Sequence, residues 1–442
     1  MKSALPKVLH RVGGRCLLQH VLDSVSGLGP VHAVVVTGYG AAEVEAAAAG
    51  RGASFVRQEP QLGTGHAVRQ ALPALDRRHP TTLVLNGDVP LVRTETAAAL
   101  AAACGGEKLA LLTITLADPA GYGRIVRDER GAVRAIVEHK DAAPHEQAIG
   151  EVYTGMLAAP TAALERWVQA LSNDNAQREY YLTDIVALAV AEGVPVVACA
   201  TGDETEVLGV NSASQLAELE RRFQRRQAEA LMDAGVRLAD PARFDLRGTL
   251  ECGHDVEIDV NCIFEGRVRI GDGARIGANS VLRDTVVEAG ATLLPFTHMD
   301  SSRVGAGAIV GPFSRLRPGA ELGPEVHIGN FVEVKNSTLG AGSKANHLAY
   351  VGDTTMGERV NYGAGSITAN YDGANKHRTV IGDDVHVGSN CVLVAPLTVG
   401  AGATIGAGST VTKGAPAGEL TVVRAKQISI AGWKRPKKKP KG

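Results

Sequence analysis

Aromatic residues are scarce in this chain of 442 residues, where phenylalanine, tyrosine and tryptophan together make up 4%. A large conventional core usually draws more of its buried surface from aromatic side chains. Cysteine is also sparse, and no two of the cysteines form a C-x-x-C pair; they are Cys16, Cys104, Cys199, Cys252, Cys262 and Cys391. This scatter is typical of reduced thiols in a cytoplasm.

Neither sign of charge dominates, because 46 basic residues stand against 47 acidic ones. The balance predicts no nucleic-acid partner and no attraction to an anionic membrane. No apolar run approaches the roughly 18 residues of a membrane span, and the N-terminus lacks the apolar stretch of a signal peptide. We therefore expect a soluble cytoplasmic protein with a solvated basic tail at 434–441.

Glycine, in contrast, is abundant, with 52 residues or about 12% of the chain against roughly 7% in an average protein. The contents of apolar residues (45%) and charged residues (21%) are ordinary, which excludes a disordered chain. No strict Gly-X-Y register is present, which excludes collagen. The length predicts two or three domains.

Up to about residue 210, apolar runs alternate with helical patterns. The apolar runs 31–36, 82–85, 110–114 and 195–198 are expected to be buried strands, and 65–75, 94–103 and 183–192 to be helices. This alternation predicts an α/β, Rossmann-like domain whose sheet is mostly parallel and covered on both faces. Ser212 then predicts the N-cap of a helix with Leu216, Leu219 and Phe223 on one side, which links the two halves.

From about residue 248, an aliphatic residue followed by glycine recurs at intervals of six, as at Ile270-Gly271 and Ile276-Gly277. A hexapeptide repeat of this kind predicts a parallel β-helix, in which six residues form each side of a triangular prism and 18 form one coil. The register breaks around 340–380, so we expect an inserted segment that protrudes there. We predict three parts: a nucleotidylyltransferase domain at 1–211, a linker helix at 212–235 and a β-helix domain at 236–442.

Three segments of the second half depart from the repeat: 312–319 (PFSRLRPG), 344–353 (KANHLAYVGD) and 370–376 (NYDGANK). Three segments of the first half resemble those of sugar-1-phosphate nucleotidylyltransferases: 5–10 (LPKVLH), 58–67 (QEPQLGTGHA) and 85–90 (LNGDVP). Together they resemble the bifunctional N-acetylglucosamine-1-phosphate uridylyltransferase / glucosamine-1-phosphate acetyltransferase family, from Leu5 onward. The resemblance implies that the β-helix is left-handed and that the protein is a homotrimer.

For the second half, the resemblance implies an acetyl transfer from acetyl-CoA to glucosamine 1-phosphate. An amino sugar attacks a thioester only as the free amine, so a base is needed, and His347 takes that place with Glu333 to orient it. Asn370 would donate a hydrogen bond where oxyanion charge develops. The sugar phosphate would contact Arg317, Lys335, Tyr350 and Asn361, and acetyl-CoA would contact Ala364, Asn370, Tyr371, Ser389, Ala407 and Arg424. A zinc site built from the other histidines, His254, His298, His327, His377 and His386, is disfavoured because nothing else supports three converging imidazoles.

For the first half, the resemblance implies transfer of a uridylyl group from UTP to N-acetylglucosamine 1-phosphate with release of pyrophosphate. Asp88 and Asn211 would hold Mg²⁺, the expected cofactor, and Lys7 would neutralise phosphate charge. The remaining expected contacts to UTP and UDP-N-acetylglucosamine are Gln58, Gln61, Gly63, Thr64, Gly123, Glu138 and Tyr153.

Three departures from the family pattern stand out. A strand and a glycine-rich loop that precede the Leu-Pro-Lys segment in the family have no counterpart here, which would leave unpaired neighbours in the middle of the sheet. We expect that the natural chain starts upstream of Met1, and that the chain as given has weak or absent uridylyltransferase activity. Tyr153 replaces an asparagine, and Asn86 stands where tyrosine is common.

The sequence therefore predicts a bifunctional enzyme that makes UDP-N-acetylglucosamine. Two alternatives stay open: an acetyltransferase with an inactive first domain, and a non-catalytic trimeric scaffold or regulatory subunit. A nucleotidylyltransferase for glucose 1-phosphate would also join two such domains, but the segments 344–353 and 370–376 argue against it.

Overall fold

The computed structural model describes residues 1–436, so 437–441 of the predicted basic tail lie outside the described residues. The chain divides into two compact units, Met1–Gln224 and Arg225–Gly442, whose boundary falls inside helix α8 (Ala213–Asp233). No helix within 1–436 is long and apolar enough to cross a membrane.

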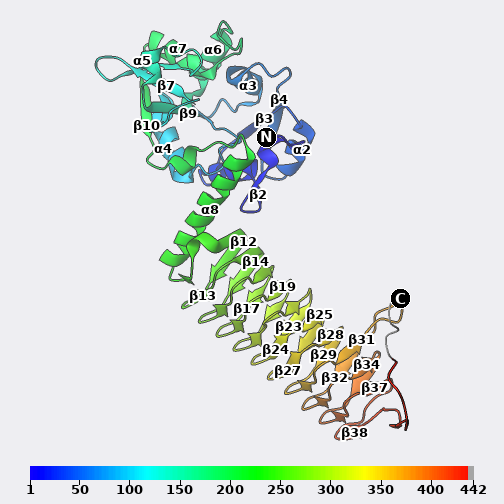
Figure 1. Ribbon diagram of the computed structural model, residues 1–442. Coiled ribbons are helices and arrows are strands. Elements are labelled where there is room, and N and C mark those ends of the chain that lie inside the picture. The colour runs from blue at the N-terminus through cyan, green and yellow to red at the C-terminus, as the bar shows by residue number, and fades with distance from the viewer. Residues whose placement is uncertain (437–442) are drawn as a thin grey trace, which may run out of the picture. The chain divides into compact units, whose positions relative to one another are not determined.

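The first unit alternates helices with strands (Figure 1). Its helices are α1 (Leu17–Ser26), α2 (Ala41–Ala47), α3 (Thr64–Ala71), α4 (Thr94–Cys104), α5 (Pro144–Gln147), α6 (Thr161–Ala170) and α7 (Ile185–Ala191). Its strands are β1 (Arg11–Val12), β2 (Arg15–Cys16), β3 (Ala33–Thr37), β4 (Ala53–Arg57), β5 (Thr81–Val84), β6 (Leu109–Thr115), β7 (Gly123–Arg127), β8 (Val133–Val137), β9 (Glu151–Pro160) and β10 (Val196–Ala200).

The main sheet is mixed, so the expectation of a mostly parallel sheet was wrong. The strand order is β10-β6-β9-β7-β8, and β5 also pairs with β9. Strands β5, β6 and β7 all run antiparallel to β9, and only β10 and β6 are parallel. Both edges of the long strand β9 are hydrogen-bonded: β6 pairs along one edge, and β5 and β7 pair with different parts of the other. Strands β3 and β4 form a separate parallel pair.

Both faces of the main sheet are covered, as expected. Alternate residues of β6 point to opposite faces, as the pleat of a strand requires. Leu109 and Leu111 pack in one cluster with Trp167 of α6, which is 1% exposed. Ala110 and Leu112 pack in another cluster with Leu100 of α4. The buried sheet holds the loops at its strand ends in fixed positions.

Helix α8 begins as the sequence predicts. The hydroxyl of Ser212 accepts a hydrogen bond from the backbone N–H of Gln215 at 3.1 Å, which is the N-cap contact. Leu219 and Phe223 on one side of the helix are buried in a cluster with Val12 and Leu17 of the first unit.

The second unit is a left-handed parallel β-helix whose coils stack along its length (Figure 1). Its strands are β11 (Arg237–Leu238), β12 (Phe244–Cys252), β13 (Glu257–Ile258), β14 (Cys262–Ile270), β15 (Arg275–Ile276), β16 (Val281–Arg283), β17 (Val286–Val287), β18 (Thr292–Leu293), β19 (His298–Asp300), β20 (Arg303–Val304), β21 (Ile309–Val310), β22 (Arg315–Leu316), β23 (Ala320–Leu322), β24 (His327–Asn330), β25 (Glu333–Lys335), β26 (Ser337–Leu339), β27 (Lys344–His347), β28 (Tyr350–Gly352), β29 (Thr354–Met356), β30 (Asn361–Tyr362), β31 (Ile367–Ala369), β32 (Thr379–Ile381), β33 (His386–Val387), β34 (Val392–Val394), β35 (Leu397–Val399), β36 (Thr404–Ile405), β37 (Thr410–Val411) and β38 (Leu420–Thr421).

The register between coils explains the hexapeptide period. One buried row runs through Ile328, Ala345, Tyr362, Val387 and Ile405, each paired with the next. Successive members are 17 or 18 residues apart, except for 25 between Tyr362 and Val387. The extra residues form the segment 370–378 between β31 and β32, so the predicted insertion is present and confined to one coil.

Candidate active sites

Four of the predicted acetyltransferase residues form one row along a corner of the β-helix. His347, Ala364, Ser389 and Ala407 each lie two residues after a member of the buried row described above. Their backbones are linked coil to coil, because the carbonyls of His347, Ala364 and Ser389 accept N–H bonds at 3.2, 2.7 and 2.8 Å from the coil above. Neighbouring coils are about 4.8 Å apart, so the row is an extended surface that leads away from His347.

The imidazole of His347 is held by the coil below it. Its Nδ1 lies 3.3 Å from Oδ1 of Asn330, and the register pairs these two residues. Because an amide oxygen only accepts, Nδ1 carries the hydrogen and Nε2 is the basic nitrogen. Within the described residues, no hydrogen bond joins Glu333 to His347. The Glu333 carboxylate instead accepts from Arg317 at 2.8 Å.

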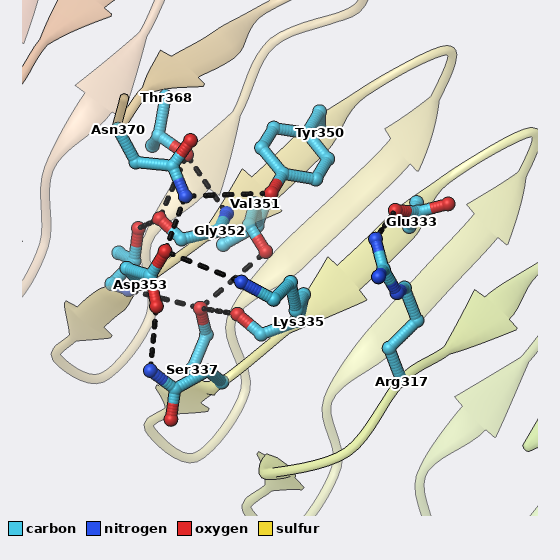
Figure 2. Close-up of polar contacts among 12 residues, drawn as sticks. Arg317, Glu333, Lys335, Ser337, Tyr350, Val351, Gly352, Asp353, Thr368 and Asn370 are labelled. Carbon is cyan, nitrogen blue, oxygen red and sulfur yellow. Dashed lines mark hydrogen bonds and ion pairs between the residues drawn. The ribbon is translucent and has the colours of Figure 1, made fainter. Parts of the chain in front are cut away.

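A cluster of cations lies on the adjoining side of the prism, where Arg317 and Lys335 occupy the same register position in neighbouring coils (Figure 2). The inserted segment adds Lys376. The Lys335 ammonium beside it lowers the pKa of Lys376, and the positive charge of Arg317 acts in the same direction. Three cationic side chains gathered in this way are suited to an anion with more than one negative charge.

Asp353 lies at the centre of this cluster, and the sequence reasoning did not single it out. Its side chain is buried, and its carboxylate accepts hydrogen bonds from the amides of Asn336, at 2.5 Å, and of Asn370 (Figure 2). The Lys335 Nζ lies 3.6 Å from the same carboxylate. Burial opposes its ionisation, but those two hydrogen bonds and the charges of Lys335 and Lys376 outweigh it and lower the pKa of Asp353. In the sequence, the feature that could have indicated Asp353 as a site residue is its position at the end of segment 344–353.

The remaining predicted residues of this half lie around the row and the cations. The hydroxyl of Tyr350 is 3.4 Å from the Asn370 amide nitrogen, and Tyr371 is exposed, with its hydroxyl donating to Gly373 O at 2.7 Å. Arg424 lies beside the upper end of the row, 3.6 Å from where a Cβ on Gly406 would stand. Asn361 starts β30 in the other sheet and pairs with Lys344 and His386.

A second row follows the first by one residue and has left-handed backbone throughout. It consists of Asn261, Asn279, Phe296, Phe313, Phe331, Leu348, Gly365, Asn390 and Gly408. Asparagine and glycine suit that conformation, whereas phenylalanine and leucine do not. The rings of Phe296 and Phe313 stack at 4.8 Å and those of Phe313 and Phe331 at 5.6 Å, and all three side chains are about half exposed. We call these three residues with Leu348 the apolar corner.

In the first unit, the two predicted metal ligands meet at one ammonium group. Nζ of Lys7 donates to Oδ2 of Asp88 at 2.6 Å and to Oδ1 of Asn211 at 2.9 Å. Lys7 belongs to the 3₁₀ turn Lys7–Leu9, and Asp88 lies in the loop after β5. Three segments distant in sequence therefore bring two oxygen ligands and one cation together at the end of β5.

The predicted uridine segment is organised by His66 of α3, which is buried. The side-chain amide nitrogen of Gln58 donates to Gly63 O at 3.0 Å and lies 3.1 Å from His66 Nδ1. The side-chain oxygen of Gln58 takes part in neither contact and can act as an acceptor. The hydroxyl of Thr64 accepts from the backbone of Leu182 at 3.1 Å. Gln61 is exposed, and its amide lies against Gly38.

Gly123, Glu138 and Tyr153 come together where β7 meets β8 and β9. Gly123 pairs with Tyr153, and a Cβ on Gly123 would lie 3.7 Å from Oε2 of Glu138. Burial raises the pKa of Glu138, although the Thr183 hydroxyl donates to it at 3.1 Å and acts in the opposite direction. Burial also raises the pKa of Tyr153, whose hydroxyl has no hydrogen-bond partner in the structure. Within 1–436, no three or more His, Cys, Asp or Glu side chains are grouped so that they could hold a metal ion.

Both units match known domain families. Residues 1–121 match the MobA-like NTP transferase domain, and 251–284 and 378–413 match the bacterial transferase hexapeptide repeats. The Bifunctional protein GlmU of Methylibium petroleiphilum is 70% identical, with 99% of this chain and 97% of the relative covered. The chain belongs to the GlmU family. The GlmU proteins of Paracidovorax citrulli and Polaromonas naphthalenivorans are 65% and 66% identical, each covering 100% of this chain and 96% of the relative.

Membership of the GlmU family confirms the predicted bifunctional enzyme, in which a uridylyltransferase is joined to an acetyltransferase. It also confirms the predicted fold class, a Rossmann-like nucleotidylyltransferase domain followed by a hexapeptide β-helix. The family implies nucleotidyl transfer and the use of acetyl-CoA. The alternatives of a single-activity enzyme and of a non-catalytic scaffold therefore lose their support.

Proposed function

We propose that the β-helix transfers the acetyl group of acetyl-CoA to glucosamine 1-phosphate, and that the first unit then couples the product to UTP. The UDP-N-acetylglucosamine and pyrophosphate so formed are the products of the second reaction. The observation that carries the acetyltransferase half is the row of His347, Ala364, Ser389 and Ala407 beside the cations Arg317, Lys335 and Lys376. A base, an extended surface and a phosphate-binding cluster lie on neighbouring sides of one corner.

In the acetyl transfer, Nε2 of His347 takes a proton from the ammonium of the amino sugar. The free amine attacks the thioester carbonyl and a C–N bond forms. As the C–S bond breaks, the nitrogen gives up its second proton to the leaving sulfur, so the products are the amide and the coenzyme A thiol, and His347 returns its own proton to water. One amide hydrogen of Asn370 goes to Asp353, and the other makes only a long contact, 3.4 Å, with the Tyr350 hydroxyl. We assign this second hydrogen to the developing oxyanion. The sugar phosphate binds to Arg317, Lys335, Tyr350 and Asn361. Coenzyme A lies along the row toward Tyr371 and Arg424.

In the uridylyl transfer, Asp88 and Asn211 would hold Mg²⁺. The fit is supported by the donor set, because a carboxylate and an amide oxygen are hard ligands and both already converge on one cation, the ammonium of Lys7. When bound, Mg²⁺ neutralises phosphate charge. Lys7 itself binds phosphate, and the free oxygen of Gln58 accepts from the N–H of the uracil ring, near Gly63, Thr64 and Gln61. Gly123, Glu138 and Tyr153 line the sugar side.

We further propose that the protein is a cytoplasmic homotrimer, divided into 1–211, 212–235 and 236–442. The apolar corner supports the trimer. Its side chains combine exposure with a backbone conformation that costs a non-glycine residue about 1 kcal/mol, and the coil gains nothing from them when they face water. A second copy of this chain that covers the apolar corner would bury these side chains beside the row that contains His347.

The acetyltransferase is tested by replacing the base. His347→Ala should reduce the rate of coenzyme A release by about a hundredfold or more, the usual contribution of a general base. The release is followed with a thiol reagent in the presence of acetyl-CoA and glucosamine 1-phosphate. His254→Ala, at an exposed turn of a distant coil, is the matched control and should retain the wild-type rate. An unchanged rate in His347→Ala would remove this residue as the base.

A further inference from the structure

Asp353 makes more contacts than its place at a corner requires. It ends one side of a coil with a left-handed backbone, and the residue is 6% exposed. The same corner position in other coils is taken by Asp284, Ser301, Gly319 and Asn336. Asp284 is exposed and accepts from the backbone N–H of Arg267 at 2.9 Å. A corner of this fold therefore needs only a small or polar residue, and a buried carboxylate needs another explanation.

The main chain and side chain of Asp353 together fasten the inserted segment. Its carboxylate accepts from Asn370, the first residue of segment 370–378, and its carbonyl accepts from the N–H of Thr379, the first residue after the segment, at 3.1 Å. Both ends of the insertion are thus joined to one residue of the coil below. Figure 2 shows Asn370 directed at the Asp353 carboxylate from the neighbouring strand.

The same residue also sets the position of Lys335. The N–H of Asp353 donates to the carbonyl of Lys335 at 3.0 Å, and the Lys335 ammonium lies 3.6 Å from the carboxylate. That separation is an ion pair rather than a close hydrogen bond, because the amides of Asn336 and Asn370 are the direct donors to the carboxylate. The ammonium is therefore held near its place while its N–H groups remain available to an anionic ligand.

We propose that Asp353 is a positioning residue of the acetyltransferase, which holds Lys335 and Asn370 in fixed relation to each other. Through Lys335 it sets where the phosphate of the acceptor binds, and through Asn370 it sets where the thioester carbonyl is polarised. The amine and the carbonyl carbon are then held within reacting distance, and holding two reactants in the reactive geometry raises the reaction rate. This role rests on the proposed acetyl transfer to a sugar phosphate.

Asp353→Asn tests the proposal because it keeps the shape and removes the charge. An asparagine also presents an NH₂ group to the two amides that now donate to the carboxylate. We expect kcat to fall about tenfold with glucosamine 1-phosphate and with glucosamine, through Asn370. Because Lys335 is displaced as well, we expect KM to rise about tenfold for glucosamine 1-phosphate and to stay unchanged for glucosamine, which carries no phosphate. Asp284→Asn, at the same corner four coils away, is the matched control and should have the kcat and KM of wild type.

The ratio of kcat/KM for the two acceptors is measured in one preparation, so it does not depend on how much of the variant is folded. An equal loss for both acceptors, with the ratio unchanged, would overturn the link to Lys335. A double-mutant cycle gives a second measurement: in a Lys335→Ala background, Asp353→Asn should change KM by less than about twofold. Additive effects on KM would overturn the proposal. If wild type releases no coenzyme A, the proposed function itself fails, which is a distinct result.

Discussion

The ammonium of Lys7 and the carboxylate of Asp88 lie 2.6 Å apart, although 81 residues separate them in the chain. Asn211 joins the same ammonium, so an amide oxygen and a carboxylate oxygen are directed at one point. We propose that Asp88 and Asn211 would hold Mg²⁺ here and that Lys7 would bind phosphate beside it, because carboxylate and amide oxygens are ligands that Mg²⁺ prefers.

Asp88→Asn should weaken Mg²⁺ binding because it removes the only anionic ligand among these three groups. We expect binding of Mn²⁺, used as a spectroscopic probe, to weaken by about tenfold or more, and UTP-dependent pyrophosphate release to fall by at least as much. Asp174→Asn, on an exposed loop of the same unit, should change neither. Unaltered Mn²⁺ affinity in Asp88→Asn would contradict the assignment of this residue as a ligand.

The apolar corner predicts a change of oligomeric state. Phe313→Asn places a residue suited to left-handed backbone at the centre of the stack, so the coil itself should not be destabilised. The substitution removes the apolar contact that we propose between copies, so we expect the proposed trimer to dissociate at low micromolar concentration. Light scattering after size-exclusion chromatography measures the mass. Val31→Asn, which alters an exposed apolar residue of the first unit, should remain trimeric.

The close stacking of coils predicts that Gly329 cannot be replaced. A Cβ at this position would lie 2.0 Å from the carbonyl oxygen of Asn346 in the next coil, where backbone cannot yield. Gly329→Ala should lower the free energy of unfolding of the β-helix by about 2 kcal/mol or more. Thermal unfolding by circular dichroism checks it. Gly414→Ala is the control, since its nearest neighbour would be 3.4 Å away; equal stability of the two variants would contradict the prediction.

Glu138 predicts a pH dependence of stability in the first unit. Burial raises its pKa above the value of 4.5 expected in the unfolded chain, so the folded state holds the proton more tightly. Its contribution to stability is therefore present below pH 4.5 and is lost as the pH rises through the folded pKa. The slope in that window is at most about 1.4 kcal/mol per pH unit for one proton.

Glu138→Gln removes this titration while it keeps the side-chain shape. The free energy of unfolding of wild type should fall as the pH rises above 4.5, and that of the variant should not. Measured by denaturant unfolding, the variant should therefore become increasingly more stable than wild type toward neutral pH. Curves that stay parallel across this range would show that Glu138 does not titrate differently in the folded protein.

Much of the second unit could be predicted from sequence because its signal is local. An aliphatic residue before each glycine fills the narrow interior, and the same six-residue pattern recurs wherever a side of the prism forms, as at Ile270 and Ile276. The inserted segment showed as a break in that pattern. The segments around His347 and Asn370 stood out by their departure from the repeat, and their resemblance to a known family predicted the acetyltransferase.

The direction of β9 in the first unit could not be predicted in this way. A buried strand has the same apolar pattern whether its neighbours run parallel or antiparallel, because the pattern records burial and not pairing. Tyr153 and Gly123 are brought together only because β9 runs against β7.

The sequence by itself therefore determined the two fold classes and the repeat, and it proposed most of the residues of each candidate site, since these depend on local patterns and motifs. Only the tertiary structure decided which of them meet. The single coil of 25 residues keeps Ser389 in the row of His347 and Ala364, and it places Asn370 over Asp353. Contacts of that kind depend on how coils stack, and residue types along the chain do not record it.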